Sequence, residues 1–250
     1  MYLCCLSGLQ EMAVNNGMND KLHYIIETFS SAGITISEEQ AYRYFALYEF
    51  MIEYNKNVNL TSITEFKDVV IKHFIDSVLP FANLDIDNGA SFIDVGTGAG
   101  FPALPLMIYR SDLKATLCDS LGKRCVYLEK VCAVIGLSAE IIHARGEELG
   151  RKRRECFDIA TARAVSAMPV LSEYCIPFVK IGGIFVALKS VNEDISTAEK
   201  AIHLLGGLIE NVYDYKLPNS DDRRVVIVRK NISTPAKYPR SSANIAKKTL

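Results

Sequence analysis

The sequence lacks several features that would place it in a special class of protein. It contains no repeat and no low-complexity segment, and no continuous apolar run approaches the roughly 18 residues that cross a membrane. The apolar first ten residues have no Lys or Arg and are followed by Glu11 rather than by a cleavage site, unlike a signal peptide. With 49% hydrophobic and 23% charged residues, the chain is expected to be a folded cytoplasmic protein, with either one large domain or one domain and a small appendage.

The cysteines indicate neither a metal site nor a disulfide framework. They stand at positions 4, 5, 118, 125, 132, 156 and 175. An odd number without a C-x-x-C pair suits neither arrangement, so we expect reduced thiols and no metal. Cys125 and Cys132 are seven residues apart and share one helical face, where small core residues are a better interpretation than ligands.

The chain has little net charge, but its charges are unevenly distributed. The formal net charge of −1 argues against a wholly basic nucleic-acid coat. Residues 1–88 carry 5 Lys/Arg and 12 Asp/Glu, whereas residues 89–250 carry 23 and 17. From Arg229 to Leu250 there are six basic residues and no acid. This tail is either solvated or a phosphate-contacting arm, and charge alone does not decide between the two.

A helical region is predicted before residue 88. Ser37-Glu38-Glu39-Gln40 is a capping box, and apolar residues follow it at helical spacing. These residues are Ala41, Tyr44, Phe45, Tyr48 and Ile52. The spacing directs this aromatic stripe toward a core rather than toward a nucleic-acid base. A break from Asn55 to Thr61 precedes a second helical stretch from about Glu65 to Leu79.

From Ser91 onward, short apolar runs alternate with helical ones. The candidate strands are Ser91–Val95, Ala115–Asp119, Glu140–His143, Phe157–Ala162, Ile184–Lys189, Ile209–Tyr215 and Val225–Arg229. This alternation is typical of a parallel sheet covered on both faces, with site loops at the carboxyl ends of the strands. We therefore predict an α/β fold with a helical extension at 1–88, a sheet domain at 89–230 and a basic tail at 231–250.

Three alternating glycines, Gly96, Gly98 and Gly100, follow the first predicted strand. Glycine permits positive φ and lets a ligand approach the bare backbone. A dinucleotide fingerprint reads G-x-G-x-x-G, but this turn reads G-x-G-x-G and is preceded by Asp94. An acid at that position would repel a phosphate but suits a cationic amino-acid group, which favours S-adenosylmethionine over NAD as the cofactor.

Asp119 ends the second predicted strand, 25 residues beyond Asp94. An acid at this position can accept hydrogen bonds from both hydroxyls of an adenosine ribose. NAD sites use the same contact, so Asp119 indicates a nucleoside rather than a particular one. The glycine turn, the acid and the strand–helix alternation together predict a nucleoside cofactor.

Several longer motifs give the chain a resemblance to a known family. They are Asn57-Val58-Asn59-Leu60-Thr61, His73-Phe74-Ile75-Asp76-Ser77, Phe92–Pro105, Asp119-Ser120-Leu121-Gly122-Lys123-Arg124, Ala162-Arg163-Ala164, Ala187-Leu188-Lys189 and Lys237-Tyr238-Pro239-Arg240. In these motifs the chain resembles the bacterial 16S ribosomal RNA guanine-N7 methyltransferases, the RsmG family, also called glucose-inhibited division protein B. The glycine motif is general to methyltransferases, whereas N-x-N-L-T, H-x-x-D-S and D-S-L-G-K-R are more specific to this family.

The resemblance implies a Rossmann-like class I S-adenosylmethionine-dependent methyltransferase with a seven-stranded, mostly parallel sheet and helices on both faces. The cofactor contacts that it implies are Gly96, Phe101, Gly146, Glu147 and Arg163. We add Gly98, Gly100 and Asp119 from the reasoning above. Arg163 would hold the cofactor carboxylate or an RNA phosphate, and an ion pair with an acid such as Asp158 is the alternative.

The resemblance also implies the reaction, which is methyl transfer to N7 of a guanine in 16S rRNA, guanine 527 in the 530 loop. Guanine N7 carries an exposed lone pair and no proton, so proximity and orientation can carry the catalysis and we nominate no acid–base residue. Thr161-Ala162-Arg163-Ala164 agrees, because it matches neither a motif for exocyclic amines nor a Pro-Cys nucleophile. His73 and Asp76 either cap the cofactor cleft or form a buried hydrogen bond between helix and domain.

An RNA partner needs cations that contact its phosphates. The candidate contacts are Lys123, Arg124, Arg145, Lys189, Arg223, Arg224, Lys237 and Arg240. Arg151-Lys152-Arg153-Arg154 is interpreted as a solvated loop, because it precedes the fourth strand and so lies opposite the site. We expect a monomer that acts on 16S rRNA or the small ribosomal subunit, with no DNA or membrane partner. A small-molecule or protein methyltransferase and a cofactor-binding regulatory protein without turnover are the alternatives.

Overall fold

The computed structural model describes residues 16–163 and 166–250, so Cys4 and Cys5 lie outside the described residues. Seven strands form one sheet in the order β3-β2-β1-β4-β5-β7-β6. The strands are β1 (Ser91–Val95), β2 (Lys114–Asp119), β3 (Glu140–His143), β4 (Phe157–Arg163), β5 (Val179–Lys189), β6 (Gly207–Lys216) and β7 (Asp222–Lys230). All seven predicted strands are confirmed, and the differences lie at the strand ends.

The sheet is parallel except at β7, which pairs antiparallel with both β5 and β6. Near the end of β1, Asp94 is in register with Leu117 of β2 and with Thr161 of β4. The carboxyl ends of these three strands therefore lie side by side, and the loops that follow them gather at one edge of the sheet. The predicted Rossmann-like, mostly parallel fold is confirmed.

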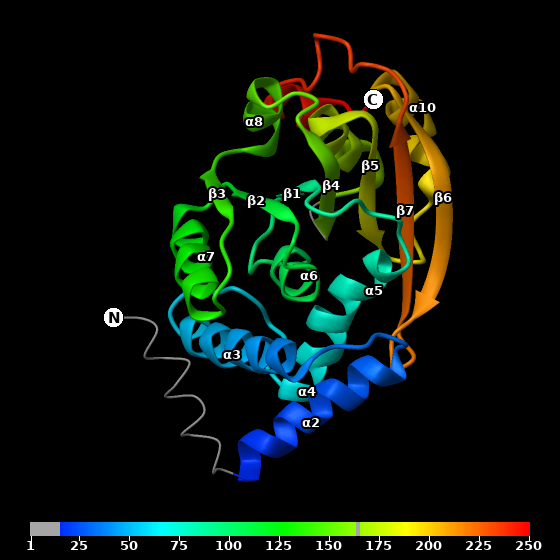
Figure 1. Cartoon of the computed structure of the whole chain (residues 1–250). Helices are drawn as coiled ribbons and strands as arrows, with labels where there is room; N and C mark the ends of the chain where they lie inside the picture. The colour runs from blue at the N-terminus through cyan, green and yellow to red at the C-terminus, as the bar shows by residue number, and fades with distance from the viewer. Residues whose placement is uncertain (1–15, 164–165) are drawn as a thin grey trace.

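Helices cover both faces of the sheet (Figure 1). They are α6 (Ala103–Tyr109) and α7 (Gly122–Val134) on one face, and α8 (Gly146–Lys152), α9 (Met168–Cys175) and α10 (Glu199–Leu204) on the other, with short 3-10 helices η3 (Ile176–Phe178) and η4 (Ile195–Ala198). Successive strand residues point to opposite faces. Phe92 packs in the core with α6 and α7, whereas Ile93 packs in the core with α9. Cys125 and Cys132 of α7 are buried, as predicted.

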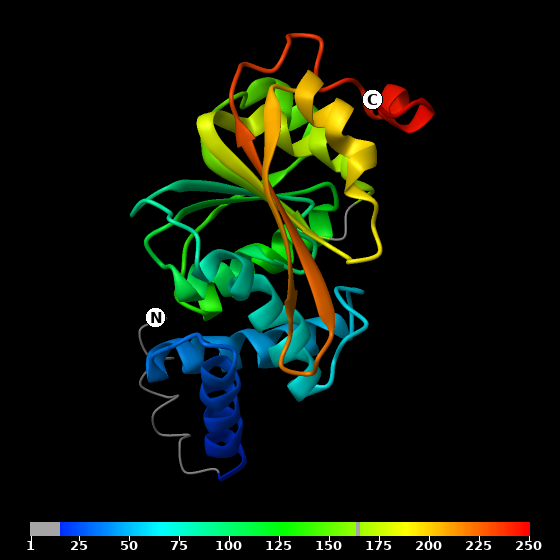
Figure 2. The ribbon, with the colours of Figure 1, turned by 90° about the vertical axis from the view of Figure 1, so that its right-hand side faces the viewer.

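The chain before the sheet is helical, as predicted. It forms α2 (Asn16–Ser31), α3 (Glu38–Asn55), α4 (Phe66–Val69), the π-helix η2 (Val70–Ile75) and α5 (Asp76–Ala82). The capping box at Ser37 is confirmed, with Ser37 and Gln40 bonding reciprocally. Figure 2 shows these helices on the far side of the molecule from the C-terminal segment. None of the helices within residues 16–163 and 166–250 is long and apolar enough to cross a membrane.

The aromatic stripe of α3 packs in the core, as its spacing predicts. Tyr44 is fully buried between Phe29 and Phe74, whose ring centroids lie 4.8 Å and 5.2 Å from its own. Its hydroxyl donates a hydrogen bond to the Pro105 carbonyl of α6 at 2.8 Å. The N-terminal helices therefore share one core with the sheet domain. The domain boundaries at 88 and 230 stay predictions, with β1 beginning at Ser91 and β7 ending at Lys230.

The interpretation of residues 151–154 as a solvated loop is wrong in part: α8 extends to Lys152, and although Arg151 and Lys152 are exposed, Arg153 and Arg154 are half-buried. Arg151 lies in the last turn of α8, and its Nε donates to the Pro239 carbonyl at 3.0 Å. Arg154 donates to the Thr234 carbonyl at 2.5 Å and also to the Tyr238 carbonyl. These acceptors are about 80 residues later in the chain, so local spacing does not reveal them. Residues 234–239 are held against the protein, which the solvated-tail interpretation does not predict.

We expect Tyr44→Phe to destabilise the protein. The substitution keeps the ring but removes the hydroxyl that donates to the Pro105 carbonyl. A buried acceptor left without its donor lowers the unfolding free energy by roughly 1–3 kcal/mol. Tyr42→Phe is the matched control, because Tyr42 is only partly buried in the same helix. Urea denaturation followed by circular dichroism measures both. Equal stabilities of the two variants would contradict the role of this bond in joining α3 to α6.

Candidate cofactor-binding site

The glycine turn after β1 has a backbone that only glycine adopts without strain. The φ angles of Gly96, Gly98 and Gly100 are 73°, 62° and 88°. A Cβ on Gly100 would also lie 2.3 Å from a methyl carbon of Leu104. The N–H groups of Gly96 and Thr97 donate to the Cys118 carbonyl at 2.8 Å and 3.1 Å, which fixes the turn to the end of β2. The turn is thus rigid and leaves its backbone bare.

Asp94 is fully buried beneath this turn. Its Oδ2 accepts hydrogen bonds from the Thr97 hydroxyl at 2.6 Å and from the Ala103 N–H at 3.3 Å. Its Oδ1 has no hydrogen-bond partner among the described residues. Burial raises the pKa of this carboxyl to about 7. A buried carboxyl with an unused acceptor fits a cationic group such as the ammonium of S-adenosylmethionine.

Asp119 joins the glycine turn to the start of α7. Its side chain is buried, with Oδ2 accepting from the Gly98 N–H and Oδ1 from the Leu121 N–H, each at 2.9 Å. Arg124 Nη1 lies 3.5 Å from Oδ2. Each carboxylate oxygen has two lone pairs, so these bonds leave acceptor capacity for ribose hydroxyls.

A cavity of about 260 Å³ opens at the carboxyl ends of β1, β2 and β3. Four predicted cofactor residues line it, namely Gly96, Asp119, Gly146 and Glu147. Val170 and Tyr174 of α9 also line it and were missed by the sequence analysis. Their separation of four residues, one turn of helix, was the available signal, but it does not distinguish a cavity wall from ordinary core packing.

Glu147 carries an unpaired acceptor in this cavity wall. The residue is only 4% exposed, and its Oε1 finds no hydrogen-bond partner within the described ranges. A buried acceptor without a donor is costly, and the amino group of adenine is a donor of suitable kind. A Cβ on the neighbouring Gly146 would lie 2.9 Å from Val95 Cγ1, so glycine is required for this close approach. The acceptors at Asp94, Asp119 and Glu147 together fit S-adenosylmethionine.

Phe101 and Arg163 lie beside the N-terminal helices and are not part of the cavity lining. The Phe101 ring is buried, with the His73 ring stacked on it at 4.4 Å and Arg163 Cζ 5.1 Å from its centroid. Arg163 also pairs with Asp76 at 3.2 Å. The alternative interpretation, an ion pair of Arg163 with an acid, is therefore confirmed, but the acid is Asp76 and not Asp158, which pairs with Lys180 at 2.7 Å. The role of Phe101 and Arg163 as cofactor contacts stays a prediction.

His73 and Asp76 form buried hydrogen bonds between helix and domain, the second of the two predicted alternatives. Asp76 accepts from the Tyr215 hydroxyl of β6 at 2.8 Å as well as from Arg163. His73 lies between the Thr61 hydroxyl at 2.8 Å and Arg163 at 3.3 Å. Burial, together with the charge of Arg163, lowers the pKa of His73 to about 3, so the imidazole is neutral. His73 lies in the π-helix η2 and Asp76 begins α5 directly after it, and π-turns are frequent at functional sites.

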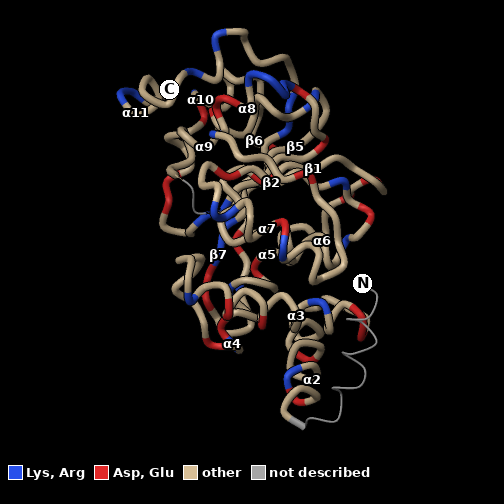
Figure 3. Tube along the Cα trace, turned by 90° about the vertical axis from the view of Figure 1, so that its left-hand side faces the viewer, with Lys and Arg blue, Asp and Glu red and all other residues tan. Residues whose placement is uncertain are grey.

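The predicted RNA contacts divide into exposed and internally paired cations. Lys123, Arg145 and Lys237 are exposed. The paired ones are Arg124 with Asp119, Lys189 with Glu193, Arg223 with Asp76, Arg224 with Asp214 and Arg240 with Glu173. Sequence alone does not separate the two groups, because the acids that pair with Arg223 and Arg240 lie far away in the chain. Figure 3 shows Lys and Arg along the C-terminal segment and beside α8.

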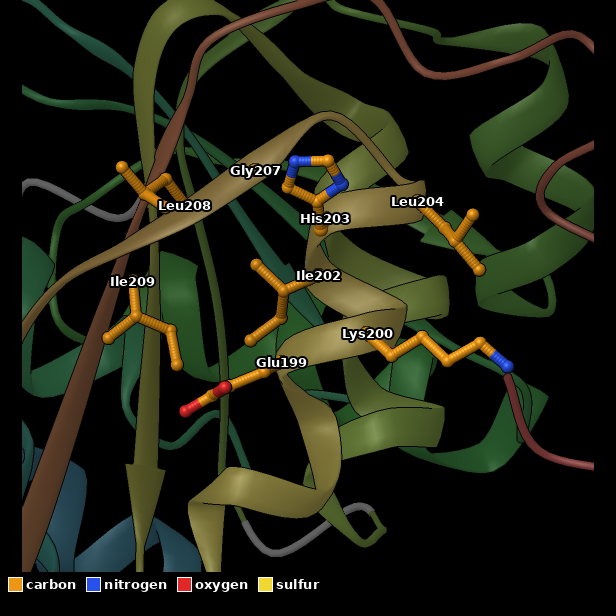
Figure 4. A pocket seen from close by; sticks show the side chains of 8 residues that line it. All are labelled: Glu199, Lys200, Ile202, His203, Leu204, Gly207, Leu208 and Ile209. Atoms are coloured by element: carbon orange, nitrogen blue, oxygen red, sulfur yellow. The ribbon is translucent and has the colours of Figure 1, made fainter.

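A larger cavity, about 520 Å³, lies at the other edge of the sheet (Figure 4). Its walls come from α10 and the first residues of β6, and Figure 4 shows that they are mostly aliphatic, with Glu199, Lys200 and His203 on α10. None of the predicted cofactor residues lines it. We therefore place the cofactor site in the smaller cavity, where the convergent acceptors are.

Solved structures share this fold. The pyocyanin biosynthetic protein PhzM aligns over 72% of this chain and 61% of its own, with a TM-score of 0.51 and 15% identity. A chain of the complex containing the Haloferax volcanii Trm112 methyltransferase activator aligns over 64% of this chain and 91% of its own, with a TM-score of 0.53 and 9% identity. The fold is that of the class I methyltransferases, and the acceptors at the carboxyl ends of its strands fit S-adenosylmethionine as the methyl donor.

Sequence relatives identify the family within this class. The GidB family model, described as rRNA small subunit methyltransferase G, matches residues 39–224. The proteins named ribosomal RNA small subunit methyltransferase G from Leuconostoc mesenteroides and Bacillus subtilis are each 44% identical to this chain. The alignments cover 90% and 86% of this chain and 97% and 94% of those relatives. The chain belongs to the rRNA small subunit methyltransferase G family, which confirms the resemblance.

We expect Asp119→Ala to weaken binding of S-adenosylmethionine more than tenfold. The change removes a charged acceptor for ribose hydroxyls, worth about 1.5–3 kcal/mol, and also frees the Gly98 N–H of the turn. Isothermal titration calorimetry measures the Kd, with Glu129→Ala as the control because Glu129 is an exposed carboxylate on α7. An unchanged Kd in Asp119→Ala would rule out the ribose assignment.

Cofactor affinity should rise with pH through about 7. Since the pKa of Asp94 is about 7, raising the pH ionises this carboxyl, and the ionised form attracts the cofactor ammonium. Above about pH 8 the α-amino group itself loses its charge and the gain ends. Calorimetry on the wild type and on Asp94→Asn tests this dependence. The variant should bind more weakly and with a flatter profile below pH 7, and a wild-type profile as flat as that of the variant would argue against the contact.

Proposed function

We propose that this protein transfers a methyl group from S-adenosylmethionine to N7 of a guanine in the 16S rRNA of the small ribosomal subunit. The family match over residues 39–224, together with the cavity acceptors, is the observation that carries the proposal. The family resemblance supports guanine 527 of the 530 loop as the target. We further propose that the protein acts as a cytoplasmic monomer on RNA rather than on DNA.

In such a reaction the residues of this chain need only bind and orient the two reactants. The cofactor supplies an electrophilic methyl group on a sulfonium, and guanine N7 needs no deprotonation. Asp119, Glu147 and Asp94 would hold the ribose, the adenine amino group and the ammonium. Their rigid placement would orient the methyl group, and orientation of this kind can lower a barrier by about 7–11 kcal/mol.

The histidine nearest the glycine turn supports a mechanism without a general base. His73 is 8% exposed, and both ring nitrogens are engaged, by Thr61 and by Arg163. With its pKa near 3, it is a weak base. We therefore give His73 and Asp76 the role of orienting Arg163 at the end of β4, where Arg163 would hold a cofactor carboxylate or an RNA phosphate.

RNA phosphates would contact the exposed cations at the cavity rim. Arg145 is exposed and lines the cavity, and Lys123 is exposed on the first turn of α7, four residues after Asp119. Lys123 and Arg145 are therefore our primary candidates. Lys189, Arg224 and Arg240 each have an internal carboxylate partner, so their use by RNA would require breaking an ion pair. Base N7 lies in the deep RNA major groove, so the target guanine is expected in a loop or a splayed strand.

The proposal is tested with tritiated S-adenosylmethionine and small ribosomal subunits that lack the modification. We expect label in 16S rRNA, and reductive strand scission should cut the RNA at a single N7-methylguanine. Naked 16S rRNA is the parallel substrate, and Asp119→Ala is the inactive control. Label on protein instead of RNA, or label at a base that resists scission, would contradict methylation at N7.

A further inference from the structure

The C-terminal strap, residues 231–250 with α11 (Ser242–Lys247), begins at a buried anchor. Lys230, the last residue of β7, is 1% exposed, and its Nζ donates to the Leu205 and Ile176 carbonyls at 3.2 Å and 3.3 Å. Glu155 accepts from the Thr234 N–H at 2.8 Å. The strap is therefore attached to the protein at its first residues and is directed over α8 and α9.

Two consecutive strap residues hold two different helices. The Pro239 carbonyl accepts from Arg151 of α8 at 3.0 Å, and a Cβ on Gly150 of α8 would lie 3.4 Å from Pro239 Cγ. The next residue, Arg240, binds Glu173 of α9. The strap thus links the end of α8 to α9 through adjacent positions of one chain segment.

The Arg240–Glu173 pair is a buried, multiply bonded contact. Glu173 is fully buried. Its Oε1 accepts from the backbone N–H of Arg240 at 2.8 Å and from Nε at 2.9 Å, and its Oε2 accepts from Nη2 at 2.6 Å. All hydrogen bonds to this carboxylate in the described part of the chain come from Arg240. A buried charge held by one partner depends on that partner, because its loss leaves the charge uncompensated.

The helices joined by the strap carry one wall of the cofactor cavity. Gly146 and Glu147 begin α8, and Tyr174, the neighbour of Glu173, lines the cavity from α9. A Cβ on Gly146 would lie 3.9 Å from Tyr174 Cβ, so the two helices approach closely at this wall. Displacement of α9 relative to α8 would move Tyr174 against the Glu147 acceptor.

We propose that Arg240 is a positioning residue for S-adenosylmethionine binding, acting through Glu173, rather than an RNA contact. Arg240 holds α9 by a buried ion pair while Pro239 holds α8, and together they set the separation of the cavity walls. The inference rests on the cofactor cavity alone and not on the identity of the RNA target. It also explains why Arg240, a basic residue of the tail, is paired with a buried carboxylate of the protein.

The test measures the Kd for S-adenosylmethionine by calorimetry in the absence of RNA. We expect Arg240→Ala and Glu173→Gln each to raise the Kd by roughly fivefold or more, within the usual range of coupling between sites. The Kd of the double variant should be no higher than the higher of the two single-variant Kd values, because both changes remove the same ion pair. Lys247→Ala is the matched control, since Lys247 is an exposed cation of the same strap, and its Kd should equal that of the wild type.

Thermal unfolding and circular dichroism check that each variant is folded. If Arg240→Ala fails to fold, Arg151→Ala decides, because Arg151 is exposed and its loss removes only the link from α8 to Pro239; it too should raise the Kd. In methylation assays Arg240→Ala should raise the KM for S-adenosylmethionine and leave the KM for rRNA unchanged. A folded Arg240→Ala protein with wild-type Kd, or with a raised KM for rRNA alone, would overturn the proposal.

Discussion

The burial of Asp94 beneath the glycine turn is the constraint on which the cofactor site depends. One oxygen of this carboxyl accepts bonds from Thr97 and Ala103, and so joins the turn to the start of α6. Asp119 repeats the arrangement on β2, where it joins Gly98 to the start of α7. Both acids are buried near the ends of the neighbouring strands β1 and β2, where Asp94 is in register with Leu117, two residues before Asp119. The backbone of the turn is therefore held in place by these two side-chain acceptors, and Asp119 also lines the cavity.

The segments outside the sheet support the site from opposite sides. On one side, the N-terminal helices bring His73 and Asp76 against Phe101 and Arg163. On the other side, the C-terminal strap reaches α9 through Arg240. Each contact buries a charged group that has its partner in a distant part of the chain, and such groups are tolerated in a protein interior only when they are paired. The extension and the strap are thus packed parts of the methyltransferase rather than appendages.

The strands and the turn were predictable because they depend on local patterns. Burial of β1 on both faces follows from its short apolar run, and Gly96, Gly98 and Gly100 indicate positive φ without reference to other residues. The partners of the cations were not predictable. Arg163, Arg154 and Arg240 pair with groups 67 or more residues away, so local spacing predicts neither Asp76 as the partner of Arg163 nor Glu173 as the partner of Arg240.

The sequence by itself determined the fold class, the cofactor turn and the family, because each depends on periodicity, glycine conformation or contiguous motifs. Only the tertiary structure decided which acids face a cavity, which cations are exposed, and what the strap does. The physical reason is that burial and pairing are properties of neighbours in space. Lys237 and Arg240 are three residues apart in one motif, yet the first is exposed and the second binds a buried glutamate.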